Sequence, residues 1–166
     1  MFRKIEDFAQ SWTYEMSATQ KLMDQLTDAS LSQRVGEGYR TLGRLAWHIT
    51  TAIPEMMSRL GLRTSAVNPK APEPKAAKEI AEAYALVSKE FLDQVTSSWR
   101  DDDLLVEDNS CGETWAKGVT ALLIVRHEIH HRGQMTVLMR QAGLKVPGAY
   151  GPSKDEWIDL GMPAQE

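Results

Sequence analysis

The chain has 166 residues, of which 42% are hydrophobic and 25% charged, and its formal net charge is −4. This length and composition fit one globular domain over residues 1–166 with a sizeable core. The 19 basic residues are scattered along the chain rather than clustered, which argues against a nucleic-acid partner.

Cysteine use and charge distribution indicate the compartment. Cys111 is the single cysteine, so neither an internal disulfide nor a cysteine-rich metal site is available, as expected in a reducing compartment. Residues 1–21 are amphipathic and charged, and no apolar run is long enough for a signal sequence or a membrane span. We therefore expect a cytoplasmic protein with no membrane partner.

Four segments carry apolar residues at spacings of three and four, which is typical of amphipathic helices. Thr41 is a suitable N-cap for the second helix and Thr114 for the fourth, while Gly143 marks the end of the fourth. A short helical turn is predicted at 154–160. The four helices are predicted at 5–26, 42–60, 75–99 and 115–142.

The connections between these segments favour a helical bundle. Residues 61–74 contain three prolines and span up to about 45 Å when extended, whereas the second helix is only about 28 Å long. The chain can therefore cross the bundle and begin the third helix parallel to the second. Residues 104–113 are predicted as a loop with at most a short extended piece, and no strand pair is expected. The predicted fold class is all-α, a four-helix bundle.

Three of the four histidines lie in one stretch of the fourth helix, His127 to Gln134 (HEIHHRGQ). His127 and His131 are one helical turn apart, so both imidazoles can reach a single ion. At about 100° per residue, the two histidines and Gln134 face inward on the apolar stripe. Glu128 and Arg132 fall on the flank of the helix, where they could form an i,i+4 ion pair.

The remaining histidine supplies a third ligand. His48 lies at the edge of the apolar stripe of the second helix, so it can face the fourth helix across a partly open cleft. His48, His127 and His131 together form a three-histidine shell that leaves coordination positions open. Glu55 is interpreted as a solvated charge or a residue that supports the ligands, and Gln134 needs a polar partner.

Two other motif interpretations compete for the same residues. His127-Glu128-x-x-His131 matches the H-E-x-x-H pattern of zinc metallopeptidases, in which the glutamate is the general base. Such enzymes need a third ligand downstream, and no histidine follows His131. Glu128-x-x-His131 also matches half of a di-iron site, but Leu45 stands three residues before His48, where the second half would need a glutamate.

The run from Thr41 to His48 (TLGRLAWH), the stretch from His127 to Gln134 and the run from Arg140 to Gly143 (RQAG) together resemble the DinB-like superfamily. This resemblance covers most of the chain in helix order. It implies an up-down-down-up bundle with a long crossover between the second and third helices. It also implies a zinc or nickel ion held by His48, His127 and His131, and a homodimer.

Members of the superfamily include metal-dependent transferases that use low-molecular-weight thiols. By this resemblance the chain is expected to be a thiol-dependent transferase or hydrolase acting on a small molecule. Two alternatives stay open, a structural metal in a binding or dimerisation module and a metallopeptidase that uses Glu128. The sequence identifies neither the substrate nor the catalytic residues.

Overall fold

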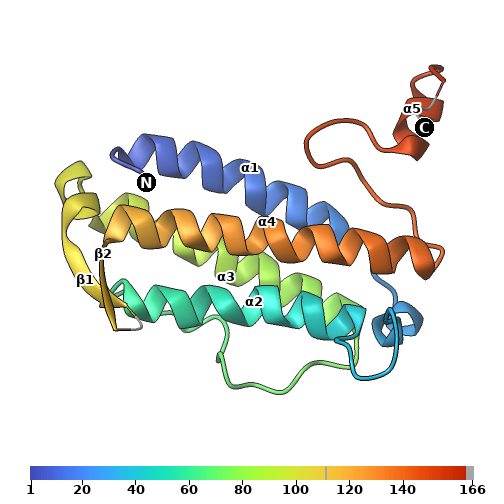
Figure 1. Cartoon of the computed structure of the whole chain (residues 1–166), viewed down its shortest axis with the longest axis horizontal. Helices are drawn as coiled ribbons and strands as arrows, with labels where there is room; N and C mark the ends of the chain where they lie inside the picture. The colour runs from blue at the N-terminus through green and yellow to red at the C-terminus, as the bar shows by residue number, and fades with distance from the viewer. Residues whose placement is uncertain (111, 164–166) are drawn as a thin grey trace.

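Four long helices dominate the computed structural model, which describes residues 1–110 and 112–163 (Figure 1). They pack as a bundle, as the sequence predicted. Cys111 lies outside the described residues. The long helices are α1 (Ile5–Met23), α2 (Leu42–Arg59), α3 (Ala77–Ser98) and α4 (Lys117–Gln141).

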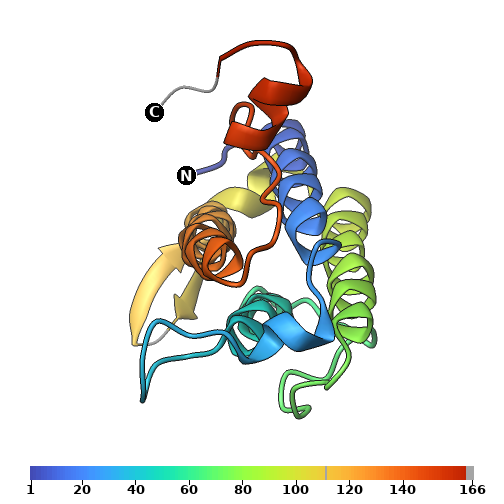
Figure 2. The ribbon, with the colours of Figure 1, turned by 90° about the vertical axis from the view of Figure 1, so that its right-hand side faces the viewer.

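The direction of the helices follows from the connection between α2 and α3. Figure 1 shows α1 and α4 running one way and α2 and α3 running the other, with residues 61–76 passing from one end of the bundle to the other. The up-down-down-up arrangement and the long crossover are therefore confirmed. Viewed end on in Figure 2, the helices follow one another around the bundle in the order α1, α3, α2 and α4. Each face of α4 consequently meets a different helix, α1 on one side and α2 on the other.

Apolar side chains from all four helices fill the space between them. Aromatic rings of α1 and α3 form its centre, where Phe91 contacts Phe8 and Trp12 edge to face at centroid distances of 5.2 and 5.1 Å. Such pairs add to the stabilisation that burial of apolar area provides. Thr41 caps α2 as predicted, because its hydroxyl accepts a hydrogen bond from the amide of Arg44 at 3.1 Å.

The segment before α4 differs from the prediction. β1 (Glu107–Ser110) and β2 (Glu113–Ala116) form an antiparallel pair in which Asp108 faces Trp115 and Asn109 faces Thr114. Thr114 and Trp115 are thus part of the ladder, so Thr114 does not cap α4, which begins at Lys117 after the N-cap Ala116. The expectation of no strand pair was wrong, because this polar hairpin is positioned by its contacts with α2 and α4 rather than by an alternating pattern of its own.

Shorter elements complete the chain. Single 3₁₀ turns, η1 and η2, follow α1 and α3, and the predicted turn near the C-terminus is the short helix α5, which lies outside the bundle (Figure 2). Their bounds are Asp28–Ser32, Asp101–Leu105 and Lys154–Asp159. No helix among the described residues has the length and apolar character needed to cross a membrane.

Candidate metal centre

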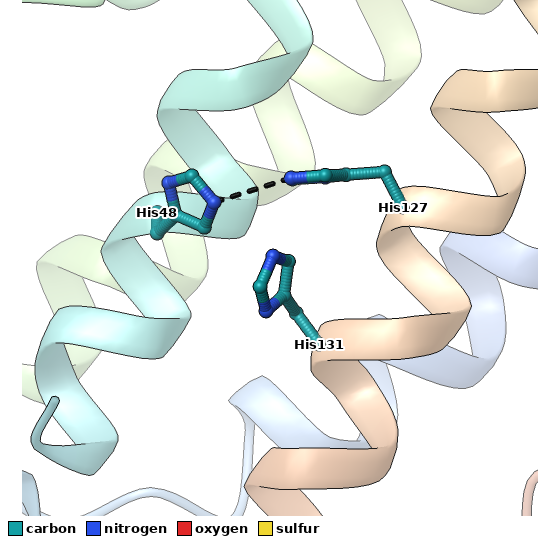
Figure 3. Close-up of side chains that lie close together, drawn as sticks. All are labelled: His48, His127 and His131. Atoms are coloured by element: carbon teal, nitrogen blue, oxygen red, sulfur yellow. Dashed lines mark hydrogen bonds between the residues drawn. The ribbon is translucent and has the colours of Figure 1, made fainter. Parts of the chain in front are cut away.

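Three histidines from two helices meet between α2 and α4 (Figure 3). His48 projects from α2, and His127 and His131 project from adjacent turns of α4. One ring nitrogen of each lies within 4.8 Å of those of the other two, and the Nε2 atoms of His48 and His127 are 3.1 Å apart. The structure therefore brings together all three residues that the sequence singled out as ligands.

The arrangement suits a small divalent ion. Two imidazole nitrogens bound tetrahedrally to zinc at about 2.0–2.1 Å lie about 3.3 Å apart. The 3.1 Å separation of the His48 and His127 nitrogens is close to that value. Imidazole ligands suit zinc, nickel and copper, and three of them leave coordination positions for water or substrate.

The protonation of these rings favours metal binding. Burial, followed by the neighbouring histidines and Arg40, lowers the pKa of His48 and of His127 to about 4. Burial also lowers the pKa of His131, although its hydrogen bond to Gln134 acts in the opposite direction. The rings are consequently neutral near pH 7, with lone pairs available for a metal.

Gln134 orients the ring of His131. Its Oε1 accepts a hydrogen bond from Nδ1 of His131 at 2.8 Å, and its Nε2 lies 3.1 Å from Nε2 of His130. A proton on Nδ1 leaves Nε2 of His131 free to bind an ion. The predicted inward orientation of Gln134 was wrong, since its side chain is exposed, but the expected polar partner is present. His130 is exposed and lies outside the three-histidine cluster.

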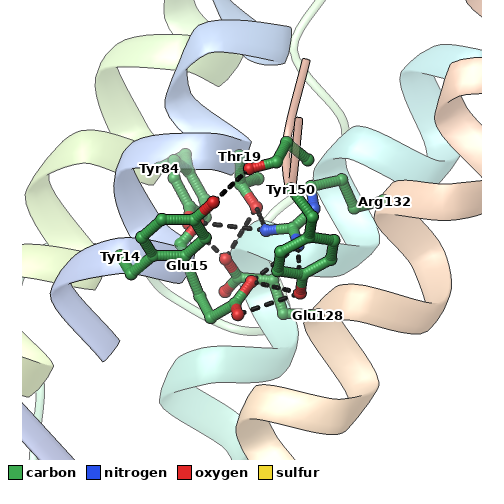
Figure 4. Close-up of polar contacts among 8 residues, drawn as sticks. Tyr14, Glu15, Thr19, Tyr84, Glu128, Arg132 and Tyr150 are labelled. Atoms are coloured by element: carbon green, nitrogen blue, oxygen red, sulfur yellow. Dashed lines mark hydrogen bonds and ion pairs between the residues drawn. The ribbon is translucent and has the colours of Figure 1, made fainter. Parts of the chain in front are cut away.

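Glu128 is buried, whereas the sequence placed it on the flank of the fourth helix. Its side chain is 1% exposed, and its Oε1 accepts hydrogen bonds from Tyr84 of α3 and Thr19 of α1, both at 2.7 Å. These contacts direct the carboxylate toward α1 and α3 (Figure 4). This position does not fit the general base of a metallopeptidase, which must reach a metal-bound water.

Arg132 is buried as well and pairs with a different acid. Its Nη2 lies 2.6 Å from Oε2 of Glu15 on α1, and its Nη1 donates to the hydroxyl of Thr19. Tyr150 of the C-terminal segment also hydrogen-bonds to Glu15 and to Arg132. The predicted ion pair between Glu128 and Arg132 is therefore replaced by a buried polar network, defined by Glu15, Thr19, Tyr84, Glu128, Arg132 and Tyr150 (Figure 4).

The burial of two residues in this network could have been predicted from the sequence. In α1, Glu15 and Thr19 continue the helical spacing of the buried residues Phe8, Trp12 and Leu22, so they occupy the inward stripe. A carboxylate on that stripe requires a buried cation or donor. Glu55, in contrast, is exposed and pairs with Arg59 at 3.0 Å, in keeping with a solvated charge.

Comparisons with known proteins place these features in context. A profile of the DinB family matches residues 1–164. An uncharacterized protein, YrdA of Bacillus subtilis (strain 168), is 43% identical over 164 residues, which covers 99% of this chain and 98% of that protein. The crystal structure of a DinB-like protein from Bacillus cereus ATCC 10987 superposes with a TM-score of 0.86 at 48% identity, over 90% of this chain and 100% of that one. A DinB-like protein from Bacillus subtilis, YjoA, shares the fold with a TM-score of 0.69 at 17% identity, over 86% of this chain and 96% of that one.

Proposed function

Because the chain belongs to the DinB family, we propose that His48, His127 and His131 bind one divalent metal ion, zinc or nickel, in a metal-dependent enzyme. The observation that carries the proposal is the convergence of three ring nitrogens within 4.8 Å, on rings that are neutral near pH 7. Neutral imidazoles bind such ions without first having to release a proton.

The proposed reaction is a thiol-dependent transfer or a hydrolysis on a small molecule. A divalent ion with open positions lowers the pKa of a bound water or thiol and so supplies a nucleophile at neutral pH. The protein's part is to hold three nitrogen donors between two helices and, through Gln134, to fix the ring of His131. Supporting features are the partly exposed rings of His48 and His127, which leave the cluster accessible.

Metal analysis of protein purified without a histidine tag tests the site. We expect about one equivalent of metal in the wild type and a large loss in His127→Ala, because two remaining imidazoles bind much more weakly. His130→Ala is the matched control, since its ring is adjacent but outside the cluster. Less than about a tenth of an equivalent in the wild type after incubation with zinc and nickel would remove the proposal.

A second experiment separates a catalytic ion from a structural one that only joins α2 to α4. Cobalt(II) replaces the native metal, and N-acetylcysteine is titrated while the absorption spectrum is recorded. A thiolate-to-cobalt charge-transfer band is expected if a coordination position is open to thiols. An unchanged spectrum at saturating thiol favours the structural role. The homodimer stays a prediction that light scattering can measure.

A further inference from the structure

A cavity of about 570 Å³ lies beside His131, between the segment that precedes α2 and the C-terminal half of α4. Its volume is in the range of small-molecule sites. Five of its lining residues are apolar or aromatic. Three of these, Val35, Tyr39 and Val137, are more than half exposed, with exposed fractions of 59, 67 and 51%. The five are Val35, Tyr39, Leu45, Val137 and Leu138.

The polar part of the lining is positive. Arg40 lines the cavity together with His131 and Gln134. Its guanidinium acts on the whole cluster, because after burial it is among the causes that lower the pKa of His48, His127 and His131. Among residues 1–110 and 112–163, no carboxylate forms an ion pair with Arg40.

Two other arginines near the cluster, Arg44 and Arg59, each have an acidic neighbour. Burial lowers the pKa of His48 most, the two neighbouring histidines and Arg40 come next, and Arg44 adds a smaller effect in the same direction. The charge of Arg44 also acts on the carboxyl of Glu73, whose pKa it lowers against the effect of burial. On the far side of the cluster, a second cavity of about 470 Å³ is lined by Arg59 and Arg126, and Arg59 pairs with Glu55. Although the protein is negative overall, the end of the first cavity near Arg40 therefore presents an uncompensated positive charge.

We propose that this cavity binds a small organic carboxylate, with its apolar body against Leu45, Val137 and Leu138 and its carboxylate beside Arg40. A guanidinium matches the two oxygens of a carboxylate, and an apolar lining favours a hydrocarbon body over a sugar or a nucleotide. The inference rests on the proposed function in one respect, that this ligand is the substrate presented to the metal. Binding itself requires only the cavity and Arg40.

The test compares three probes that share one body, 4-phenylbutyrate, 4-phenylbutan-1-ol and 4-phenylbutylamine. Each is titrated into the full chain, both zinc-loaded and chelator-treated, and chemical shifts of the Val137 and Leu138 methyl groups are followed by NMR. We expect the acid to bind about five to ten times more tightly than the alcohol, and the amine more weakly than either. The preference should persist without metal, because Arg40 is not a ligand.

Two variants assign the preference to one residue. Arg40→Met should remove most of the advantage of the acid over the alcohol while the alcohol binds as before. Arg126→Met is the matched control, since it removes the same charge from the second cavity. Both side chains are exposed, so neither change should unfold the protein, which circular dichroism verifies.

The outcomes separate this inference from the proposed function. Equal binding of acid and alcohol to the wild type, no shift at Val137 and Leu138 with any probe, or equal effects of Arg40→Met and Arg126→Met would overturn the carboxylate site. In each of those cases zinc binding by the three histidines is untouched. Conversely, a chain that binds the acid through Arg40 but binds no metal keeps the cavity assignment and loses the proposed function.

Discussion

Glu128 is a carboxyl group held almost entirely out of water next to His127 of the three-histidine cluster. Burial raises its pKa to about 7, although hydrogen bonds from Tyr84 and Thr19 and the charge of Arg132 act in the opposite direction. Its Oε2 is buried and has no hydrogen-bond partner among the described residues. The folded state therefore retains a proton on this group that the unfolded chain releases near pH 4.5.

The first prediction concerns Glu128→Gln. The stability that the protonated carboxyl provides is fully present below about pH 4.5 and is lost as the pH rises through about 7. Glutamine does not titrate, so the unfolding free energy of the variant should rise relative to that of the wild type by at most about 3 kcal/mol between those pH values. Urea unfolding of metal-free protein at pH 5 and pH 8 measures the difference. Glu55→Gln, at an exposed position, should show no comparable change, and parallel profiles for Glu128→Gln and the wild type would contradict the burial argument.

The second prediction concerns Arg132, which is 2% exposed and pairs with Glu15. Arg132→Met leaves a buried carboxylate without its cation, which should cost about 3–5 kcal/mol of unfolding free energy. Lys89→Met breaks the exposed pair with Asp93 and should cost less than about 1 kcal/mol. Adding Glu15→Gln to Arg132→Met should recover part of the loss. Equal losses of unfolding free energy for Arg132→Met and Lys89→Met in chemical denaturation would show that the buried pair contributes no more to stability than the exposed one.

Among the elements, the long helices were predictable because each carries a stripe of apolar residues with a period near 3.6. Each helix begins and ends within three residues of the predicted bounds. The N-cap at Thr41 was predictable because it depends only on a side chain and an amide three residues apart. The hairpin was missed for the opposite reason. β1 is Glu-Asp-Asn-Ser, without apolar alternation, so only its pairing with β2 and its position against the helices define it as a strand.

The orientation of side chains on α4 was only half predictable. One apolar stripe placed His127 and His131 correctly toward α2. The prediction assumed that α4 has a single buried stripe. In the structure α4 has a second buried face against α1, and this face carries Glu128 and Arg132. Charged residues on a packed face are compatible with burial only through partners on other helices, and those partners are more than 40 residues away in sequence.

The third prediction belongs to the pair of helices that the site joins. Metal bound by His48, His127 and His131 links α2 to α4, so zinc at about 100 times its Kd should stabilise the fold by about 2.7 kcal/mol. Thermal unfolding with zinc and with chelator measures this gain. His48→Ala should lose most of it, since only α4 then supplies ligands, and His130→Ala should retain it. A gain that survives His48→Ala would place the ion elsewhere.

At the scale of the whole molecule, residues 148–162 lie beyond Val146, the last core residue of the chain, and are attached mainly through contacts with α1. Tyr150 stacks on Tyr14 and hydrogen-bonds to Glu15, and α5 lies outside the bundle (Figure 2). The apolar residues Ile158 and Leu160 are 61% and 62% exposed. This segment therefore depends on its contacts with α1 rather than on a core of its own.

The fourth prediction follows for Tyr150→Phe. Loss of the hydroxyl removes hydrogen bonds to Glu15 and Arg132, which should cost only about 1 kcal/mol globally because water can reach the exposed ring. Amide hydrogen exchange at residues 146–160 should accelerate more than exchange in α2 and α3. Tyr39→Phe, also at an exposed tyrosine, is the control and should leave this segment unchanged. Uniform acceleration over the whole chain would contradict local attachment.

His48 and His127 lie 79 positions apart in the chain, on the second and the last of the four long helices. Bringing them together closes a long loop, and the entropy lost in that closure is recovered only when the helices pack. A ribosome must therefore complete α4 before the three nitrogens can meet. The proposed metal site is therefore complete only when α2 and α4 have packed, and metal uptake during refolding should lag behind the formation of helical structure.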